Sequence, residues 1–390
     1  MVPINRMHIA WLGKKSPFCG NVTYGREVTN ALLDRGHRVS FLHFAQEDSS
    51  EQDWPDCPEV LLPFLFKSTI YTIPTPRSSK ILTEALQKLK PDIVHASLTL
   101  SPLDFRLPEI CEELKIPLVA TFHPPFDSKL RNLSSSTQFL TYQLYAPFLA
   151  HYDKVIVFSH LQRNLLIKLG VPRRKLAIIP NGVDSDRYSP GASPIKEKYQ
   201  AKRLFVYLGR IAPEKNVEAL LKAWKACDMG EEAKLLIVGN GLLKSTLQPL
   251  YGLEYGIHWL GFIADEETRI QILRAADVFI LPSLVEGLSL SLLEAMACGT
   301  ACLATDAGAD GEVLEKGAGV ILNTQGVTTQ LKTLLPLFRD HEEITVLLGK
   351  KARERVLERY TFQENINSLE ALYQKVLMQN PDLLSLHTIE

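Results

Sequence analysis

One stretch in the second half of the chain, Pro282 to Glu294, most constrains the possible fold. The apolar run before it, residues 277–281 (Asp-Val-Phe-Ile-Leu), is typical of a buried parallel strand. Leu292 to Ala297, followed by Cys-Gly, predicts a helix with a glycine stop. The stretch is therefore a loop from a strand to a helix. In open α/β sheets ligands bind at the carboxyl ends of strands, where the N–H groups of the next helix favour anions and hydroxyl oxygens.

Two acidic residues lie in this stretch. Glu286 is in the loop and Glu294 is about one turn into the helix, with seven residues between them. One carboxylate can therefore face a ligand from the loop while the other faces it from the helix start. Two alternatives stay open: Ser291 and Glu294 also match a Ser-x-x-Glu capping box, and Glu286 alone could be a solvated loop acid. The pairing of the two acids in this setting favours a binding site.

Further loops of the second half contain residues suited to an anionic ligand. The strand 204–208 is followed by Gly209 and Arg210, and Lys215 lies where the next helix opens. A glycine turn, two cations and a helix N-terminus predict an anion site, although a surface salt bridge is the alternative for both cations. Two more strand ends, after residues 235–238 and 257–260, have glycines that allow close approach of a ligand. Their candidate residues are Gly239, Gly241 and Phe262.

The first half predicts a second parallel sheet. The strand 8–12, a helix ending at Arg35 and the strand 39–44 form a β-α-β opening, and the first loop contains Gly20 and Asn21. His123 follows the strand 116–122 and so lies at a strand carboxyl end, where ligand sites form. His95, in the strand 92–96, is a weaker candidate of the same kind.

Composition narrows the class of protein. The chain has 390 residues, 46% of them hydrophobic, and a formal net charge of -1, which suits two α/β domains and argues against nucleic-acid binding. The six cysteines form no Cys-x-x-Cys pair, so neither a zinc site nor a disulfide framework is predicted. No apolar run approaches the ~18 residues needed to cross a bilayer, and no signal peptide is evident. We expect a cytoplasmic protein that is soluble or peripheral to a membrane.

Two segments of the first half combine apolar and basic residues. The segment Trp54 to Arg77 favours a buried strand with proline-edged turns, and a surface that docks on anionic membrane or holds an acyl chain is the alternative. The segment Arg131 to Tyr152 predicts a helix with aromatic residues on one face. Core packing is the favoured role of that face, and an acceptor or membrane contact is the alternative.

The spacing of Glu286 and Glu294 resembles the Glu-x7-Glu signature of retaining, nucleotide-sugar-dependent glycosyltransferases of family GT4. The resemblance spans nearly the whole chain and implies the α/β GT-B fold, with two Rossmann-like doubly wound parallel-sheet domains facing across a cleft. It implies an acceptor-binding domain at residues 1–185 and a donor-binding domain at residues 201–355. A C-terminal helix at residues 361–378 would cross back onto the first domain. Residues 185–200, which contain two prolines and a glycine, are by their composition typical of a domain linker.

The resemblance also implies roles for the candidate residues. Glu286 would hold hydroxyls of the donor sugar, and Glu294 would hold the nucleotide ribose. Arg210 and Lys215 match the Gly-Arg-x-x-x-Glu-Lys pattern that binds the donor diphosphate, and His123 would lie beside the transferred sugar. Phe262 would pack near the nucleotide base. The remaining donor-binding positions that it implies are Gly20, Gly209, Gly239, Gly241, Gly287, Leu288, Ser289 and Leu290.

The chain departs from the family pattern at three positions in two of these loops. Ser289 stands where a glycine is common, Ser291 where a proline is common, and Gly20-Asn21 where the family often has two glycines. The catalytic set implied by the resemblance is Glu286, His123, Arg210 and Lys215, without a cofactor or a metal. Asp184 and Asp186 form an Asp-x-Asp sequence, which we do not interpret as a metal motif because no nearby carboxylate or histidine completes an oxygen-rich shell.

The opening from Gly13 to Glu27 resembles cyanobacterial lipid glycosyltransferases, which include digalactosyldiacylglycerol synthase. That resemblance implies transfer of galactose from UDP-galactose to a galactolipid such as monogalactosyldiacylglycerol, on the surface of a thylakoid or plasma membrane. Three alternatives stay open. They are a transferase for a soluble sugar or cell-wall acceptor, a sugar-nucleotide epimerase on the same fold, and a binding protein without activity. The presence of both carboxylates and both cations argues against the last.

Overall fold

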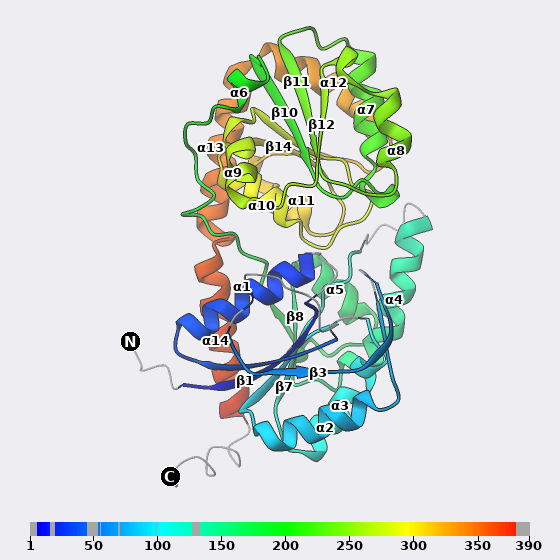
Figure 1. Ribbon diagram of the computed structural model, residues 1–390, viewed down its shortest axis with the longest axis vertical. Helices are drawn as coiled ribbons and strands as arrows, with labels where there is room; N and C mark the ends of the chain where they lie inside the picture. The colour runs from blue at the N-terminus through cyan, green and yellow to red at the C-terminus, as the bar shows by residue number, and fades with distance from the viewer. Residues whose placement is uncertain are drawn as a thin grey trace. The chain divides into compact units, whose positions relative to one another are not determined.

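The computed structural model describes residues 6–15, 20–44, 54, 56–68, 71–98, 100–126 and 133–379, with only the backbone described at 133–137. The chain divides into two compact units (Figure 1). The first contains the described residues of Met1–Pro124, Tyr142–Ile179 and Ile366–Glu390, and the second those of Pro125–Thr141 and Pro180–Asn365. Each unit is built on its own all-parallel sheet, which confirms the predicted pair of Rossmann-like α/β domains.

The first unit has a seven-stranded sheet in the order β3-β2-β1-β6-β7-β8-β9. Its strands are β1 (His8–Gly13), β2 (Arg38–His43), β3 (Glu59–Leu61), β6 (Ile93–Ser97), β7 (Leu118–Thr121), β8 (Lys154–Val157) and β9 (Leu176–Ile178). The strand order reverses between β1 and β6, where Ile9 pairs with Ile93. Both strands are buried along their whole length, as the apolar runs predict.

Helices cover both faces of this sheet, with α1 and α14 on one face and α2 and α3 on the other (Figure 1). The helices that lie wholly or partly in this unit are α1 (Gly20–Asp34), α2 (Ser78–Leu89), α3 (Leu103–Glu113), α4 (Leu133–Leu149), α5 (His160–Lys168) and α14 (Phe362–Met378), with the 3-10 turn η1 (Arg173–Lys175). The part of α14 that belongs to this unit is anchored by polar contacts. Glu370 pairs with Arg35 and, at 2.9 Å, with His37, and the Tyr373 hydroxyl lies 2.5 Å from Nδ1 of His95.

The favoured interpretation of Trp54 to Arg77 as a buried strand was wrong. The segment contains the short edge strand β3 and an antiparallel ribbon of β4 (Phe64–Lys67) and β5 (Thr72–Pro74). This ribbon is a two-stranded sheet separate from the main sheet, and in it Leu65 is 70% exposed and Phe66 49% exposed. In α4, Tyr142 and Tyr145 are buried, as core packing predicts, whereas Phe148 is 37% exposed.

The second unit has a six-stranded sheet in the order β12-β11-β10-β13-β14-β15. Its strands are β10 (Arg203–Leu208), β11 (Ala233–Val238), β12 (Ile257–Gly261), β13 (Val278–Leu281), β14 (Ala301–Thr305) and β15 (Val320–Leu322). Numbered within the unit this is the order 3-2-1-4-5-6 of dinucleotide-binding folds, which reverses between β10 and β13. Ligands bind such sheets in the crevice at that reversal, outside the carboxyl ends of the two strands.

The helices of this unit again lie on both faces, with α7 and α12 on one face and α9, α10 and α13 on the other (Figure 1). They are α6 (Ile195–Lys198), α7 (Val217–Cys227), α8 (Lys244–Leu247), α9 (Glu266–Ala275), α10 (Leu290–Ala297), α11 (Asp310–Val313), α12 (Val327–Asp340) and α13 (Glu342–Arg359). The 3-10 turns are η2 (Pro213–Lys215), η3 (Gln248–Leu250), η4 (Leu253–Tyr255) and η5 (Glu315–Gly317). Residues 185–200, predicted as a linker, pack on this unit, where Arg353 donates to the carbonyls of Ser185 and Tyr188. Within the described residues, no helix combines the length and apolar character needed to cross a membrane.

Candidate functional site

The loops after β10 and β13 meet at the strand-order reversal of the second unit. These strands are neighbours, with Phe205 opposite Val278, so their carboxyl ends place the two loops side by side. The N–H of Leu284 donates to the carbonyl of Glu214 at 2.8 Å, which joins the loops through their backbones. Arg210, Lys215 and Glu286, predicted separately from the sequence, are thereby brought into one cluster.

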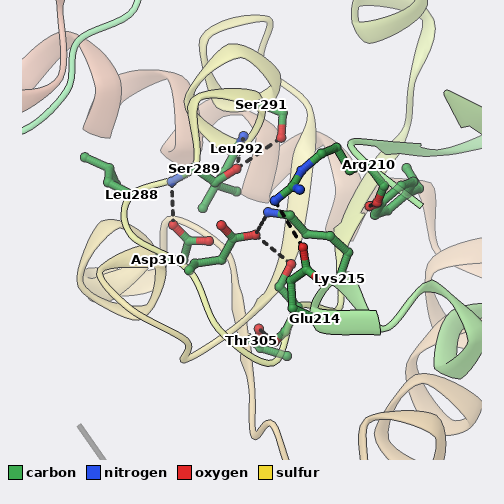
Figure 2. Close-up of polar contacts among 12 residues, drawn as sticks. Arg210, Glu214, Lys215, Leu288, Ser289, Ser291, Leu292, Thr305 and Asp310 are labelled. Atoms are coloured by element: carbon green, nitrogen blue, oxygen red, sulfur yellow. Dashed lines mark hydrogen bonds and ion pairs between the residues drawn. The ribbon is translucent and has the colours of Figure 1, made fainter. Parts of the chain in front are cut away.

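An ion pair between Lys215 and Glu286 forms the centre of this cluster. Lys215 Nζ lies 2.5 Å from Glu286 Oε1, and the Ser283 hydroxyl donates to the same oxygen at 2.7 Å. Glu286 is only 7% exposed, so the cation and the hydroxyl stabilise a charge that burial alone would disfavour. Figure 2 shows Lys215 and Arg210 reaching into the same polar cluster.

Arg210 is held more loosely than Lys215. Its guanidinium pairs with Glu214 at 3.0 Å, and the side chain is 52% exposed. An exposed ion pair of this kind contributes little to stability, so Arg210 can exchange Glu214 for an anionic ligand at small cost. The arrangement is a largely buried cation beside a buried carboxylate, with a second cation that is half exposed.

A third carboxyl, Asp310, joins the cluster and was missed by sequence reasoning. Its Oδ1 accepts from the N–H of Ser289 at 2.9 Å, as Figure 2 shows, and the residue is fully buried. Among the described residues its Oδ2 has no hydrogen-bond partner. Burial, and next the charge of Glu286, raise the pKa of Asp310 well above its usual range. The local pattern of residues 306–312 is only that of a glycine-rich loop, and nothing in it marks this acid.

Glycine lets the Asp310 loop approach the backbone of Glu286. Gly308 has φ +59°, and a Cβ there would lie 2.2 Å from the carbonyl oxygen of Glu286. One residue later, the N–H of Ala309 donates to the carbonyl of Gly287 at 2.7 Å. The carbonyl of Leu288 accepts from Asn181 at 3.4 Å. The predicted donor-binding loop is therefore fixed by contacts along its backbone.

The capping-box interpretation of Ser291 and Glu294 was wrong. Helix α10 begins at Leu290, two residues earlier than predicted, because Ser289 has extended backbone angles and acts as the N-cap. Its hydroxyl accepts from the N–H of Leu292 at 3.4 Å and lies 3.0 Å from the hydroxyl of Ser291. Glu294 therefore lies beyond the first turn and satisfies no donor of the helix start.

Glu294 instead faces a polar group of side chains from other elements. Burial raises the pKa of its carboxyl to about 7, against the opposing effect of Arg269, and the charge of Glu266 raises it further. The Tyr188 hydroxyl donates its hydrogen to Glu266 at 3.1 Å, and its closeness to Glu294 favours the charged form of that carboxyl. This carboxyl consequently changes charge near neutral pH, and hydroxyl donors of a ligand would favour its ionised form.

Glycines allow the loops after β10 and β11 to touch. Gly239 has φ +139°, and a Cβ there would lie 1.8 Å from the carbonyl oxygen of Gly209. Gly241 has φ +157°, and its Cβ would lie 2.4 Å from the oxygen of Ile211. Both positions exclude any other residue. Phe262, directly after β12, is 58% exposed.

The other predicted site residues, Gly20 and His123, belong to the first unit. Gly20 is the first residue of α1, and a Cβ there would meet no described atom within 4 Å. His123 is half-buried two residues after β7, and its Nε2 lies 2.9 Å from the Ser97 hydroxyl. Burial, and next the charge of Lys14, lower the pKa of His123 to about 3, so the ring is neutral at physiological pH.

His95, the weaker candidate, is a core residue. It is fully buried, and its ring stacks on Trp11 with 4.0 Å between centroids. Both ring nitrogens already have partners, Tyr373 at 2.5 Å and Thr121 at 2.8 Å. No ring nitrogen of His95 is left to bind a ligand.

Side chains that could hold a metal ion do not gather in the described part of the chain. Across the ranges that the structure describes, no three His, Cys, Asp or Glu side chains lie close enough to form a metal site. Asp184, in the Asp-x-Asp sequence, accepts from the N–H groups of Asp186 and Arg187, both at 3.1 Å. These hydrogen bonds close a turn at the start of the second unit.

The chain matches two family models, one in each half. Residues 20–187 match the model described as Glycosyltransferase Family 4, and residues 192–355 match that described as Glycosyl transferases group 1. Among curated proteins, it is 24% identical over 375 residues to N-acetyl-alpha-D-glucosaminyl L-malate synthase of Bacillus anthracis, covering 92% of this chain and 94% of that protein. It is 27% identical over 306 residues to alpha-monoglucosyldiacylglycerol synthase of Streptococcus pneumoniae, covering 73% and 67%.

Solved structures agree in fold. The crystal structure of Anabaena Alr3699/HepE in complex with UDP and glucose matches with a TM-score of 0.76 at 18% identity, over 95% of this chain and 100% of that one. At this level of identity the likeness concerns the fold. The two family models, the strand orders and this structural match agree, and the chain belongs to the GT4 glycosyltransferases of GT-B fold.

Proposed function

We propose that this chain is a retaining hexosyltransferase that moves galactose from UDP-galactose to a membrane glycolipid. The observation that carries the proposal is the ion pair of Lys215 and Glu286 at the reversal point of the second sheet, with the half-exposed cation of Arg210 in the same cluster. A buried carboxylate beside two cations suits a ligand that has both hydroxyls and a diphosphate.

The proposed donor contacts follow from these groups. Arg210 and Lys215 bind the diphosphate, while Glu286 accepts hydrogen bonds from sugar hydroxyls. Glu294 accepts hydrogen bonds from the ribose, and Phe262 packs near the base. UDP is the proposed nucleotide, a choice supported by the complex of Anabaena Alr3699/HepE with UDP and glucose. The proposed donor site also contains Gly20, Gly209, Gly239, Gly241, Gly287, Leu288, Ser289 and Leu290.

The proposed chemistry takes place on one face of the sugar. The bond between the anomeric carbon and the diphosphate breaks, and a bond to the acceptor hydroxyl forms on the same face. The acceptor proton passes to the departing phosphate oxygen, so no covalent enzyme intermediate is required. Arg210 and Lys215 stabilise the negative charge that develops on the leaving group. In this proposal the cations of the chain supply that stabilisation, and no cofactor takes part.

A lipid acceptor is supported by two observations. The ribbon of β4 and β5 exposes Leu65 and Phe66, which directly precede Lys67, and apolar side chains beside a cation suit an anionic lipid surface. One relative is named as an alpha-monoglucosyldiacylglycerol synthase. Together with the likeness of residues 13–27 to digalactosyldiacylglycerol synthase, they support peripheral binding to a membrane and a galactolipid acceptor such as monogalactosyldiacylglycerol.

A soluble acceptor is the second candidate. It is supported by the relative that aligns over 92% of this chain, which is named as a synthase of N-acetyl-alpha-D-glucosaminyl L-malate. A donor-by-acceptor assay separates the two candidates. Labelled UDP-galactose or UDP-glucose is supplied with monogalactosyldiacylglycerol in mixed micelles or with soluble hydroxy acids and sugars. Label in a more polar lipid supports the lipid acceptor, whereas UDP release with only a soluble acceptor overturns it. Glu286→Gln, which keeps the shape of the side chain, should abolish either reaction.

A further inference from the structure

A line of hydrogen bonds in the first unit connects α1 to His123. The Ser97 hydroxyl donates to Oδ1 of Asn21 at 2.6 Å, and Ser97 Oγ lies 2.9 Å from His123 Nε2. Asn21 also donates through Nδ2 to the carbonyl of Leu98 at 3.2 Å. Asn21 is one of the positions where this chain departs from the glycine pair of its family, so the line depends on a residue particular to this sequence.

The hydrogen bonds determine where the proton of the His123 ring lies. Turning the Asn21 amide over would bring its oxygen against the carbonyl of Leu98, so Oδ1 must face Ser97. The Ser97 hydroxyl has a single hydrogen, which it donates to Asn21. Ser97 Oγ can therefore only accept from His123, and Nε2 must be the protonated ring nitrogen.

The other ring nitrogen of His123 is then a hydrogen-bond acceptor. The ring is neutral, because burial and the nearby charge of Lys14 lower its pKa far below 7. Tyr24 and Phe158 pack on the ring with centroids 5.0 Å and 5.3 Å away, which restricts its rotation. Within the described part of the chain, no hydrogen bond reaches Nδ1.

We propose that Asn21 and Ser97 are positioning residues that fix His123 in its Nε2-protonated neutral form, so that Nδ1 accepts a hydrogen bond from one hydroxyl of the transferred sugar. This inference rests on the proposed function, in which His123 lies beside the donor sugar. The contact also bears on specificity. An acceptor nitrogen requires a hydroxyl hydrogen at that position, and a donor sugar with fluorine in place of that hydroxyl has none to give.

The form of the ring can be measured without the transfer reaction. Protein labelled with 15N-histidine is studied by NMR between about pH 5 and 8, the range in which an ordinary histidine titrates, and His123→Gln identifies the signal. We expect a neutral ring with hydrogen on Nε2 throughout. Asn21→Leu releases the Ser97 hydroxyl to donate to Nε2, which should move the hydrogen to Nδ1.

Ser40→Ala provides a matched control. Ser40 is a buried serine of the same unit whose hydroxyl lies 2.9 Å from Nε2 of His8, the same contact as between Ser97 and His123. The change should leave the His123 signal unaltered, whereas Ser97→Ala should alter it. Hydrogen on Nδ1 in the wild type, or no change in Asn21→Leu, would overturn the inference.

A kinetic measurement tests the contact with the sugar. UDP-sugars with one hydroxyl replaced by fluorine are compared with the parent donor in the wild type and in Asn21→Leu. For each protein, the kcat/KM of the parent donor is divided by that of the fluorinated donor. For one of the fluorinated donors, we expect this ratio to be about tenfold larger in the wild type than in Asn21→Leu, which is the effect of one hydrogen bond. The inductive effect of fluorine is the same in both proteins and cancels when the two ratios are compared. If NMR gives the expected form but no fluorinated donor separates the two proteins, the sugar contact is overturned and the position proposed for His123 fails with it.

Discussion

Removing the cation from the pair of Lys215 and Glu286 should destabilise the second unit far more than removing both charges. The two side chains are 16% and 9% exposed, so Lys215→Met leaves a largely buried carboxylate without its counter-ion. Breaking a buried pair from one side costs about 3–5 kcal/mol. Ser283 still donates to Glu286, so we expect the lower end, about 3 kcal/mol. For a domain of 150–250 residues this lowers the melting temperature by about 6–12 °C.

The double variant Lys215→Met with Glu286→Gln tests the reasoning. The amide of Gln still accepts from Ser283 but has no charge, so stability should return to within about 1 kcal/mol of the wild type. Both variants should be inactive, because both lack a residue of the proposed site. Thermal and urea unfolding at neutral pH provide the measurement, with Arg210→Met as a control that removes an exposed pair and should cost less than about 1 kcal/mol. A double variant as unstable as Lys215→Met would refute the electrostatic argument.

Three further predictions concern other groups. Because the pKa of Glu294 is raised to about 7, its ionised form is gained as pH rises, and UDP binding measured by calorimetry should tighten through about pH 7 and then level off. Glu294→Gln should bind UDP more weakly and with little dependence on pH; an equally steep dependence would contradict the ribose role. The pKa of the Asp310 carboxyl is raised in the folded chain, so as pH rises this carboxyl loses its proton in the unfolded chain before it does so in the folded chain. The contribution of Asp310 to stability therefore declines as pH rises above 3.8, its ordinary pKa, toward the pKa in the folded chain. The melting temperature of Asp310→Asn should therefore rise relative to that of the wild type as the pH increases over that range. A difference in melting temperature that does not change with pH would count against a protonated Asp310. Replacing Leu65 and Phe66 together by Ser should weaken co-sedimentation with vesicles containing anionic lipid while leaving the melting temperature nearly unchanged, since both side chains are exposed. Undiminished binding would exclude the ribbon as the lipid contact.

Much of the fold was predictable because its signals are local. Parallel strands buried on both faces are continuous apolar runs, so β1, β10 and β13 were evident from the sequence. Parallel strands also place their following loops at one sheet edge, so Arg210, Lys215 and Glu286 could be assigned to strand ends before their contacts were known. The ribbon of β4 and β5 was misjudged because an apolar run does not tell whether a second layer covers it.

The sequence by itself determined the two parallel sheets, the loops that follow their strands, and the chemical types of the side chains on those loops. The tertiary structure decided which of these side chains meet. Asp310 reaches Ser289 across 21 positions, and Ser97 connects Asn21 to His123 across 76 and 26 positions. It also decided protonation, since the raised pKa of Glu294 and the lowered pKa of His123 arise mainly from burial. Burial and long-range hydrogen bonds depend on neighbours that packing brings from other strands and helices, and no local pattern of residues encodes them.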